Sequence, residues 1–119
     1  MSIDIELETD KSEYEVGKKI EATLSLVNDG SVEEEIFFNN GQRYDFILKK
    51  GTEEVWRWSK GKMFIMATGT VNLAPGEERS YTEKLEPEDL GLGEYELIGI
   101  ITGEPEFRDS CSINFVGRV

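Results

Sequence analysis

Residues 41–59 read GQRYDFILKKGTEEVWRWS, and this stretch decides the fold of the chain. It consists of two arms that alternate apolar and polar residues, with Lys50-Gly51-Thr52 between them. Because successive side chains along a strand point to opposite faces, Tyr44, Phe46 and Leu48 share one face of the first arm. A glycine between two alternating arms indicates a β-hairpin. The stretch therefore predicts two antiparallel strands joined by a short turn.

Both tryptophans of the chain lie on the second arm of this hairpin. Trp56 and Trp58 are two residues apart and share one face, with Val55 and Arg57 on the other face. This spacing has two interpretations: an exposed aromatic platform, or side chains that pack into the core of a sandwich. We expect at least one of the two tryptophans to be buried.

Strand patterns of the same kind follow one another along the rest of the chain. Apolar residues alternate with polar ones over residues 3–7, 20–26, 32–38, 71–73, 81–85, 93–102 and 111–115. Tyr95 follows Gly93 at the start of a late strand, as in the tyrosine corner of immunoglobulin-like sandwiches. We therefore predict an all-β fold, a single immunoglobulin-like antiparallel β-sandwich of about seven to nine strands. One domain spans residues 1–119, a length that can bury a core without disulfides or a metal.

The residue types that carry most catalysis and metal binding are scarce. The chain has no histidine, which excludes Ser-His and Cys-His nucleophile pairs and histidine metal ligands. Its single cysteine excludes a zinc site made of thiolates, and no calcium or phosphate loop motif is present. We expect a protein that is not an enzyme, with no catalytic residues, no resident metal and no cofactor. Adventitious calcium at the acidic turns stays open.

The lone cysteine and the chain start bear on localisation. Cys111 has no intrachain partner, which fits a reducing cytoplasm, and its parity with Ile113 and Phe115 predicts an inward, packing role. The first residues, MSIDIELETD, are acidic and alternating, unlike a signal peptide. No apolar run approaches the ~20 residues of a membrane helix. We expect a cytoplasmic protein with no membrane partner.

Charge is distributed unevenly along the chain. The net charge is −12, which argues against a nucleic-acid partner. Residues 41–62, however, carry six basic and three acidic residues. Two readings stay open: lysines and arginines that keep the hairpin solvated, or a basic patch that orients a partner. The basic residues are Arg43, Lys49, Lys50, Arg57, Lys60 and Lys62.

Five short motifs follow one another in a distinctive order. They are Gly41-Gln42-Arg43-Tyr44-Asp45-Phe46, Val55-Trp56-Arg57-Trp58-Ser59, Lys62-Met63-Phe64, Leu73-Ala74-Pro75-Gly76-Glu77 and Gly93-Glu94-Tyr95. In this order the chain resembles the BsuPI family, the Bacillus-type intracellular proteinase inhibitors. The resemblance is strongest over residues 40–77 and weak over the first 30 residues. It implies an all-β inhibitor of a cytoplasmic, subtilisin-type serine protease, and it assigns no inhibitory residue by position.

The residues after the hairpin are the best candidates for contact with a protease. A substrate-like inhibitor presents a rigid, extended loop, because rigidity removes the ordering cost of binding. The candidate protease-binding loop comprises Lys60, Lys62, Met63, Phe64, Ile65 and Met66, supported by Arg43, Lys49, Lys50, Trp56, Arg57 and Trp58. The alternative is that Met63, Phe64 and Ile65 are core residues of a short strand or a crossover.

Two other functions remain open at this stage. The first is a non-inhibitory immunoglobulin-like module that binds a protein partner through a sheet face or edge, because a sandwich supports many binding roles. A weaker alternative is a sugar-binding sandwich in which Trp56 and Trp58 stack on sugar rings.

Overall fold

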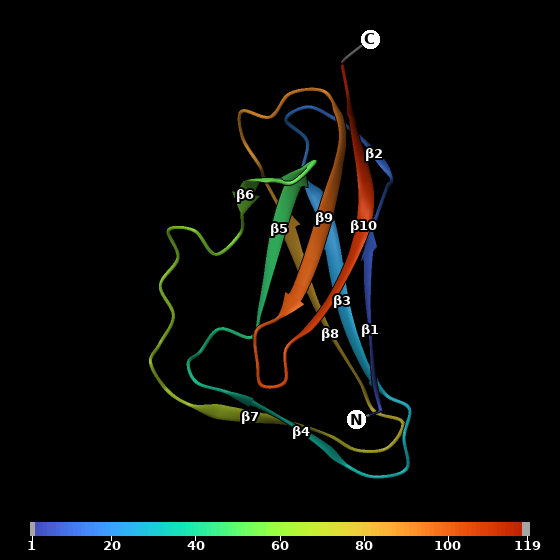
Figure 1. Cartoon of the computed structure of the whole chain (residues 1–119), viewed down its shortest axis with the longest axis vertical. Coiled ribbons are helices and arrows are strands. Elements are labelled where there is room, and N and C mark those ends of the chain that lie inside the picture. Colours follow the sequence, from blue (N-terminus) through green and yellow to red (C-terminus); the bar gives the residue numbers. More distant parts are fainter. Residues whose placement is uncertain (1, 118–119) are drawn as a thin grey trace.

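The computed structural model describes residues 2–117 and is an elongated β-sandwich with principal extents of 51 × 30 × 23 Å (Figure 1). Ten strands, and no helix, are found among these residues. The strands are β1 (Ile3–Thr9), β2 (Glu13–Glu15), β3 (Ile20–Asn28), β4 (Glu34–Phe38), β5 (Tyr44–Lys50), β6 (Glu53–Arg57), β7 (Gly69–Leu73), β8 (Glu78–Leu85), β9 (Gly93–Ile101) and β10 (Phe107–Val116).

Two main sheets make up the layers of the sandwich. One has the strand order β1-β3-β8 and the other has the order β2-β10-β9-β5-β6. The predicted hairpin is β5 and β6, which pair antiparallel with a register shift between Leu48 and Lys49. Strand β5 also pairs with β9, so the hairpin joins the larger sheet, and β6 forms its edge.

The core lies between the two sheets and follows from the alternation in the sequence. In β3, Ile20, Leu24 and Leu26 are buried, and each pairs with a residue of β8. They face the buried side chains of the larger sheet, among them Phe46 and Leu48 of β5. Burying such side chains contributes about 1.5–3 kcal/mol each, which makes this layer the main source of stability.

A third, two-stranded sheet covers one end of the sandwich. Strands β4 and β7 pair antiparallel and lie across the lower end in Figure 1. Asn28, at the end of β3, is fully buried there and donates from Nδ2 to the backbone oxygens of Val32 (2.8 Å) and Leu73 (2.9 Å). Its Oδ1 accepts from the Gly30 amide at 3.0 Å. One amide side chain therefore ties the small sheet to the main layers.

The all-β sandwich predicted from the sequence is confirmed, with two differences in detail. The described residues hold ten strands, above the expected range, and β2 pairs with β10 in parallel. The pattern around Tyr14 was too short to predict a strand. The tyrosine corner is present, since the Tyr95 hydroxyl donates to the Gly91 carbonyl at 2.8 Å. Cys111 is half-buried against the core, and burial raises the pKa of its thiol.

Candidate functional site

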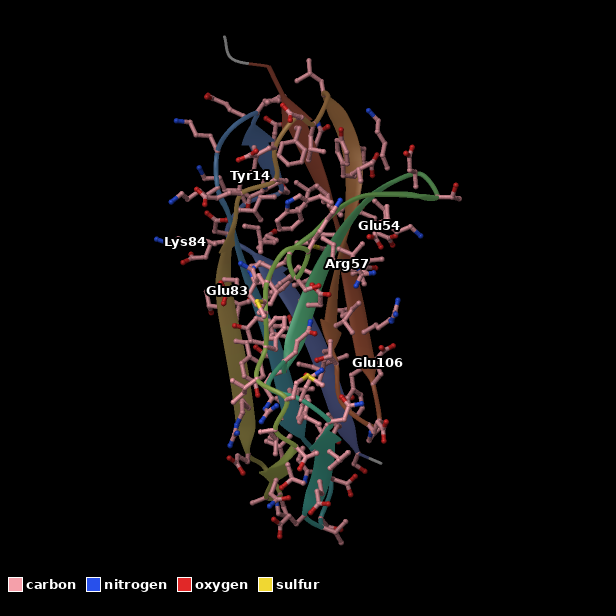
Figure 2. All side chains as sticks on the ribbon, turned by 90° about the vertical axis from the view of Figure 1, so that its left-hand side faces the viewer. Tyr14, Glu54, Arg57, Glu83, Lys84 and Glu106 are labelled. Atoms are coloured by element: carbon pink, nitrogen blue, oxygen red, sulfur yellow. The ribbon has the colours of Figure 1, made fainter. Side chains whose placement is uncertain are left out.

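The connection from β6 to β7, residues 58–68, contains no strand and exposes a set of apolar side chains; we call it the 58–68 loop. Met63 is 97% exposed, Met66 86% and Ile65 74%, whereas Phe64 is half-buried. The loop leaves the sandwich at the left of Figure 1 and faces the viewer in Figure 2. Large apolar side chains gathered on one exposed segment mark a contact surface more often than isolated ones do.

The loop begins with a tight turn. The Lys62 amide donates to the Ser59 carbonyl at 3.0 Å, and Gly61, the third residue of the turn, has φ of 81°. A turn with positive φ at its third residue favours glycine there, because other residues are strained in that conformation. The sequence Ser-Lys-Gly-Lys therefore directs the chain outward from the sandwich into residues 62–66.

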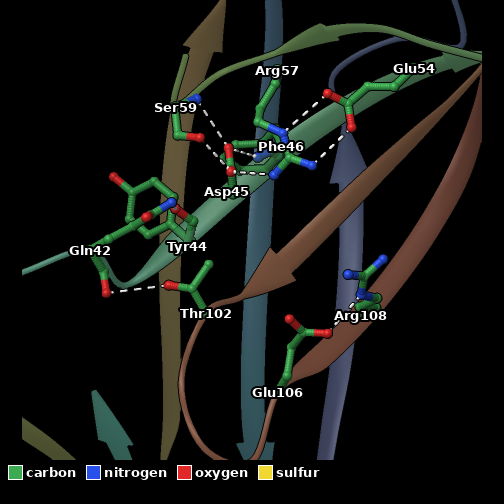
Figure 3. Close-up of polar contacts among 10 residues, drawn as sticks. All are labelled: Gln42, Tyr44, Asp45, Phe46, Glu54, Arg57, Ser59, Thr102, Glu106 and Arg108. Carbon is green, nitrogen blue, oxygen red and sulfur yellow. Dashed lines mark hydrogen bonds and ion pairs between the residues drawn. The ribbon is translucent and has the colours of Figure 1, made fainter. Parts of the chain in front are cut away.

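A buried carboxylate holds the start of the loop. Asp45 of β5 is 2% exposed, and its Oδ1 accepts from the amides of Phe46 (2.8 Å) and Ser59 (3.1 Å). Its Oδ2 accepts from the Ser59 hydroxyl at 2.6 Å and from Arg57 Nη1 at 3.0 Å (Figure 3). Hydrogen bonds to a buried charge are among the strongest a protein makes. We call Asp45, Arg57 and Ser59 the Asp45 tie.

Electrostatics strengthen this tie on its outer side. Arg57 also bonds Glu54, with Nη2 at 2.8 Å from Oε1. The hydrogen bonds from Arg57 lower the pKa of Glu54, and Glu54 and then Asp45 raise the pKa of Arg57. The guanidinium thus bridges two carboxylates (Figure 3), of which Asp45 is buried and Glu54 is exposed.

Aromatic rings form the floor beneath the loop. The Trp58 ring lies 5.1 Å from the Tyr44 ring, 6.4 Å from Phe46 and 6.1 Å from Phe64, measured between centroids. Tyr44 also contacts Tyr81 of β8 at 4.9 Å, so the cluster joins the two main sheets. Such pairs contribute about 0.5–1.5 kcal/mol each beyond the area they bury.

The hydroxyl of Tyr44 is part of the same floor. It donates to Glu83 Oε1 on β8 at 2.6 Å. Burial raises the pKa of Tyr44, and the neighbouring Glu83 carboxylate raises it further. The phenol therefore stays protonated and continues to donate well above neutral pH.

A backbone contact holds the far end of the loop. The Gly41 amide donates to the Ile65 carbonyl at 2.7 Å. A Cβ atom placed on Gly41 would lie 2.7 Å from Ile65 Cγ1 and 3.2 Å from the Ile65 carbonyl oxygen. Glycine at position 41 therefore allows this close approach. We call this contact the Gly41 tie; together with the Asp45 tie it leaves residues 60–64 between two fixed points.

The structure shows which side chains of the loop are exposed and which are packed. The alternative that Met63 and Ile65 are core residues is wrong, because both are largely exposed. Phe64 is half-buried against Trp58, so it is neither a core residue nor a fully exposed one. Neither tryptophan is fully buried, contrary to our expectation; Trp56 and Trp58 are half-buried and pack against the core cluster. Their position at a sheet edge beside an open loop accounts for the exposed remainder.

The basic residues around the hairpin are spread over the molecule. The Arg43 guanidinium lies over Phe38 (4.5 Å), Lys50 over Tyr95 (5.0 Å) and Lys62 over Trp58 (4.8 Å), each distance taken to the ring centroid. Lys49 of β5 is half-buried, and Lys60 is exposed in the turn. Lys60 and Lys62 thus lie beside the exposed apolar residues, whereas Lys50 lies beside the turn that precedes β9.

Three residues of the site were not assigned a role from the sequence. Asp45 occupies a polar position of an alternating strand, which by itself predicts a solvated carboxylate. The available signal was Ile47, an apolar residue on the same face, which indicates that this face is also covered. Ser59 and Gly41 carry no local signal for their roles, because each role depends on a partner distant in the chain.

Two kinds of feature are absent from the described residues. Within residues 2–117, no three histidine, cysteine or acidic side chains are grouped so as to hold a metal ion. In the same range, no helix is long and apolar enough to span a membrane. The 58–68 loop is thus an apolar segment held on a rigid scaffold, and apolar residues of this kind are enriched at the centre of protein interfaces.

The fold and the 58–68 loop define a β-sandwich that presents a loop fixed at both ends. The model of the BsuPI family, described as intracellular proteinase inhibitor, matches residues 7–106. The chain therefore belongs to the BsuPI family of intracellular proteinase inhibitors. No curated protein matches the sequence.

Solved structures share the fold at low sequence identity. The sporulation control protein Spo0M from Bacillus subtilis is 18% identical with a TM-score of 0.66, and the match covers 99% of this chain and 51% of that one. The β-glucosidase EmGH1 from Erythrobacter marinus (13%, 0.59) is covered over 15% of its length, with 97% of this chain matched. The DNA glycosylase AlkC from Pseudomonas fluorescens (13%, 0.58) is covered over 30%, with 96% matched. This chain spans about half of the Spo0M chain and a smaller share of the other two chains. These likenesses concern the fold alone.

Proposed function

We propose that this protein inhibits a cytoplasmic, subtilisin-type serine protease by seating residues 60–66 of the 58–68 loop in the active-site cleft. The single observation that carries the proposal is the exposure of Met63, Ile65 and Met66 on a segment fixed at both ends. Family membership supplies the class of partner, a proteinase.

Fixation of the loop is what favours inhibition over simple cleavage. A flexible peptide loses conformational entropy when it binds, and its ends separate once it is cut. Here the Asp45 tie and the Gly41 tie hold both ends on one scaffold. The loop therefore enters a cleft with little ordering cost, and its two sides stay in place around the reacting bond.

Side-chain chemistry favours a cleft with apolar pockets. The outward residues are two methionines and an isoleucine, which gain binding free energy by leaving water. Lys60 and Lys62 flank them and favour acidic surface around the rim of the cleft. The resemblance to the BsuPI family implies a subtilisin-type serine protease, and a cleft with apolar pockets of this kind suits the side chains of the loop.

The decisive experiment titrates the purified protein against a purified intracellular subtilisin and follows peptide hydrolysis. We expect hydrolysis to fall to a small residual rate at micromolar inhibitor. Undiminished hydrolysis at that concentration contradicts the proposal for this protease. A consistent partner that is not a protease would then favour the non-inhibitory binding module.

A second arm of the experiment asks whether the cleft itself is the contact. The protease is first blocked with phenylmethanesulfonyl fluoride, whose benzyl group occupies the primary pocket. We expect the blocked protease to lose most of its affinity in a calorimetric titration. Equal affinity for free and blocked protease would place the contact outside the cleft, on a sheet face or edge.

A further inference from the structure

The 58–68 loop exposes two methionines, and their surroundings differ. We propose that Met63, and not Met66, enters the primary specificity pocket of the protease, and that this pocket is an apolar one suited to large aliphatic side chains. This inference rests on the proposed function and adds the residue that sets specificity.

The two neighbours of Met63 are both turned toward the protein. Lys62 Nζ lies 4.8 Å from the centroid of the Trp58 ring, and the Phe64 ring lies 6.1 Å from it. Because side chains of an extended chain alternate between two sides, residues flanked in this way point away from the scaffold. Met63 is 97% exposed, the highest value among the large apolar residues found exposed in the described part of the chain.

Met63 also lies between the two ties. The Asp45 tie fixes Ser59 four residues before it, and the Gly41 tie fixes Ile65 two residues after it. Met66 lies outside this frame, between Ile65 and the start of β7 at Gly69. A side chain held from both sides keeps its position when a pocket closes on it, whereas one beyond the last tie does not.

The side chain itself indicates the chemistry of the pocket. The thioether is unbranched and apolar, and it adapts to a deep pocket without a charge at its base. A pocket with a carboxylate at its base would leave that charge without a partner once it closed on methionine. The favoured target is therefore a protease that cleaves after large apolar residues rather than after lysine or arginine.

Inhibition constants of four proteins against one intracellular subtilisin test the inference: the wild type, Met63→Asp, Met63→Leu and the matched control Met66→Asp. Burying a carboxylate in an apolar pocket is strongly unfavourable, so we expect Met63→Asp to weaken inhibition by about 100-fold or more. Met63→Leu preserves apolar volume, and we expect it to stay within about threefold of the wild type. We expect Met66→Asp to weaken inhibition by no more than about tenfold, because Met66 contributes apolar contact at the edge of the cleft and does not enter the pocket.

The outcomes separate this inference from the function on which it rests. If the wild type does not inhibit the protease, both the proposed function and the assignment of Met63 are contradicted. A wild type that inhibits, with Met63→Asp equally potent or Met66→Asp weakened as much as Met63→Asp, overturns the assignment of Met63 and leaves the inhibitory function standing. Thermal unfolding of all four proteins is the folding control, and we expect no change because both positions lie in solvent.

Discussion

Asn28 and Asp45 are the buried polar or charged side chains of the described residues, and they hold different things in place. Asn28 binds backbone groups at Val32, Leu73 and Gly30, all within the packed lower end of the sandwich. Asp45 binds Arg57 and Ser59, from which an exposed apolar segment departs.

Both side chains meet the same physical requirement, but they stabilise different parts of the molecule. A buried polar group has to be hydrogen-bonded, so both side chains satisfy all their buried atoms. At Asn28 the bonds join the end of β3 to the buried Leu73 of the small sheet and to the backbone at Gly30 and Val32. At Asp45 they fix a loop whose apolar side chains remain in water. We therefore expect changes at Asn28 to alter stability alone, and changes at Asp45 to alter stability and inhibition together.

The largest effect is expected from Asn28→Leu. The apolar side chain removes the buried hydrogen bond to the Leu73 carbonyl and the partly buried ones to Val32 and Gly30, so we expect a loss of about 3 kcal/mol in the free energy of unfolding. Urea unfolding followed by tryptophan fluorescence measures it. Below the unfolding transition the inhibition constant is expected to stay within about twofold of the wild type. A large rise in that constant would remove the distinction between the two regions.

Asp45→Asn is expected to have the next largest effect on stability. The amide keeps the shape of the carboxylate but loses its charge and presents an NH₂ group to donors, so we expect a loss of about 2 kcal/mol. With Ser59 released, we also expect inhibition to weaken by about tenfold, which corresponds to 1.4 kcal/mol.

Ser59→Ala is the matched control for Asp45→Asn, because it removes one bond of the tie and leaves the charge paired with Arg57. A smaller loss of inhibition is expected for it. If Asp45→Asn destabilises the fold while inhibition is unchanged, Asp45 is a structural residue like Asn28.

Gly41→Ala tests the other tie with little effect on stability. The added Cβ pushes Ile65 outward, while the restriction of the unfolded chain offsets part of the strain, so the net change is expected to stay below about 1 kcal/mol. Inhibition is expected to weaken, because the far end of the loop moves. Gly91→Ala is the control, since its added Cβ meets no atom closer than 3.9 Å. Equal inhibition by both variants would show that the loop needs no second tie.

The smallest effect on inhibition is expected far from the loop, at Tyr14, where the expected change is one of stability at alkaline pH. Burial, and then the hydrogen bond to Asp10, raise the pKa of Tyr14 from 10.0 to about 12. A group whose pKa is raised by folding stabilises the fold below its unfolded pKa and ceases to do so as the pH rises through its folded pKa. Between pH 10 and 12 the wild type should therefore lose stability more steeply than Tyr14→Phe. Parallel unfolding curves for the two proteins over that range would contradict this.

Periodicity was enough to predict the sandwich. Alternation places Ile20, Leu24 and Phe46 in the core, and each of them is buried as the pattern requires. The short strand β2 was missed because three residues carry too little pattern, and its stability depends on pairing with β10. Local patterns predict a strand well when buried residues repeat within it. They predict it poorly when the strand forms only because it pairs with a distant one.

The candidate loop could be located from the sequence, but not its conformation. The composition of residues 62–66 suits a core strand as well as an exposed loop, so exposure could not be predicted from these residues. It depends on the turn at Gly61 and on two ties to residues far away in the chain. For the same reason the sequence does not distinguish Met63 from Met66 as a candidate contact residue, because the difference depends on the contacts of Lys62 and Phe64 with Trp58.

The most direct test of the loop as the inhibitory contact is amide hydrogen exchange of the protein, alone and with a saturating amount of intracellular subtilisin. We expect new protection at residues 59–66 and at Asn40 and Gly41, with the face of the β1-β3-β8 sheet unchanged. Protection on that sheet face, with residues 59–66 exchanging as in the free protein, would contradict the assignment of the loop.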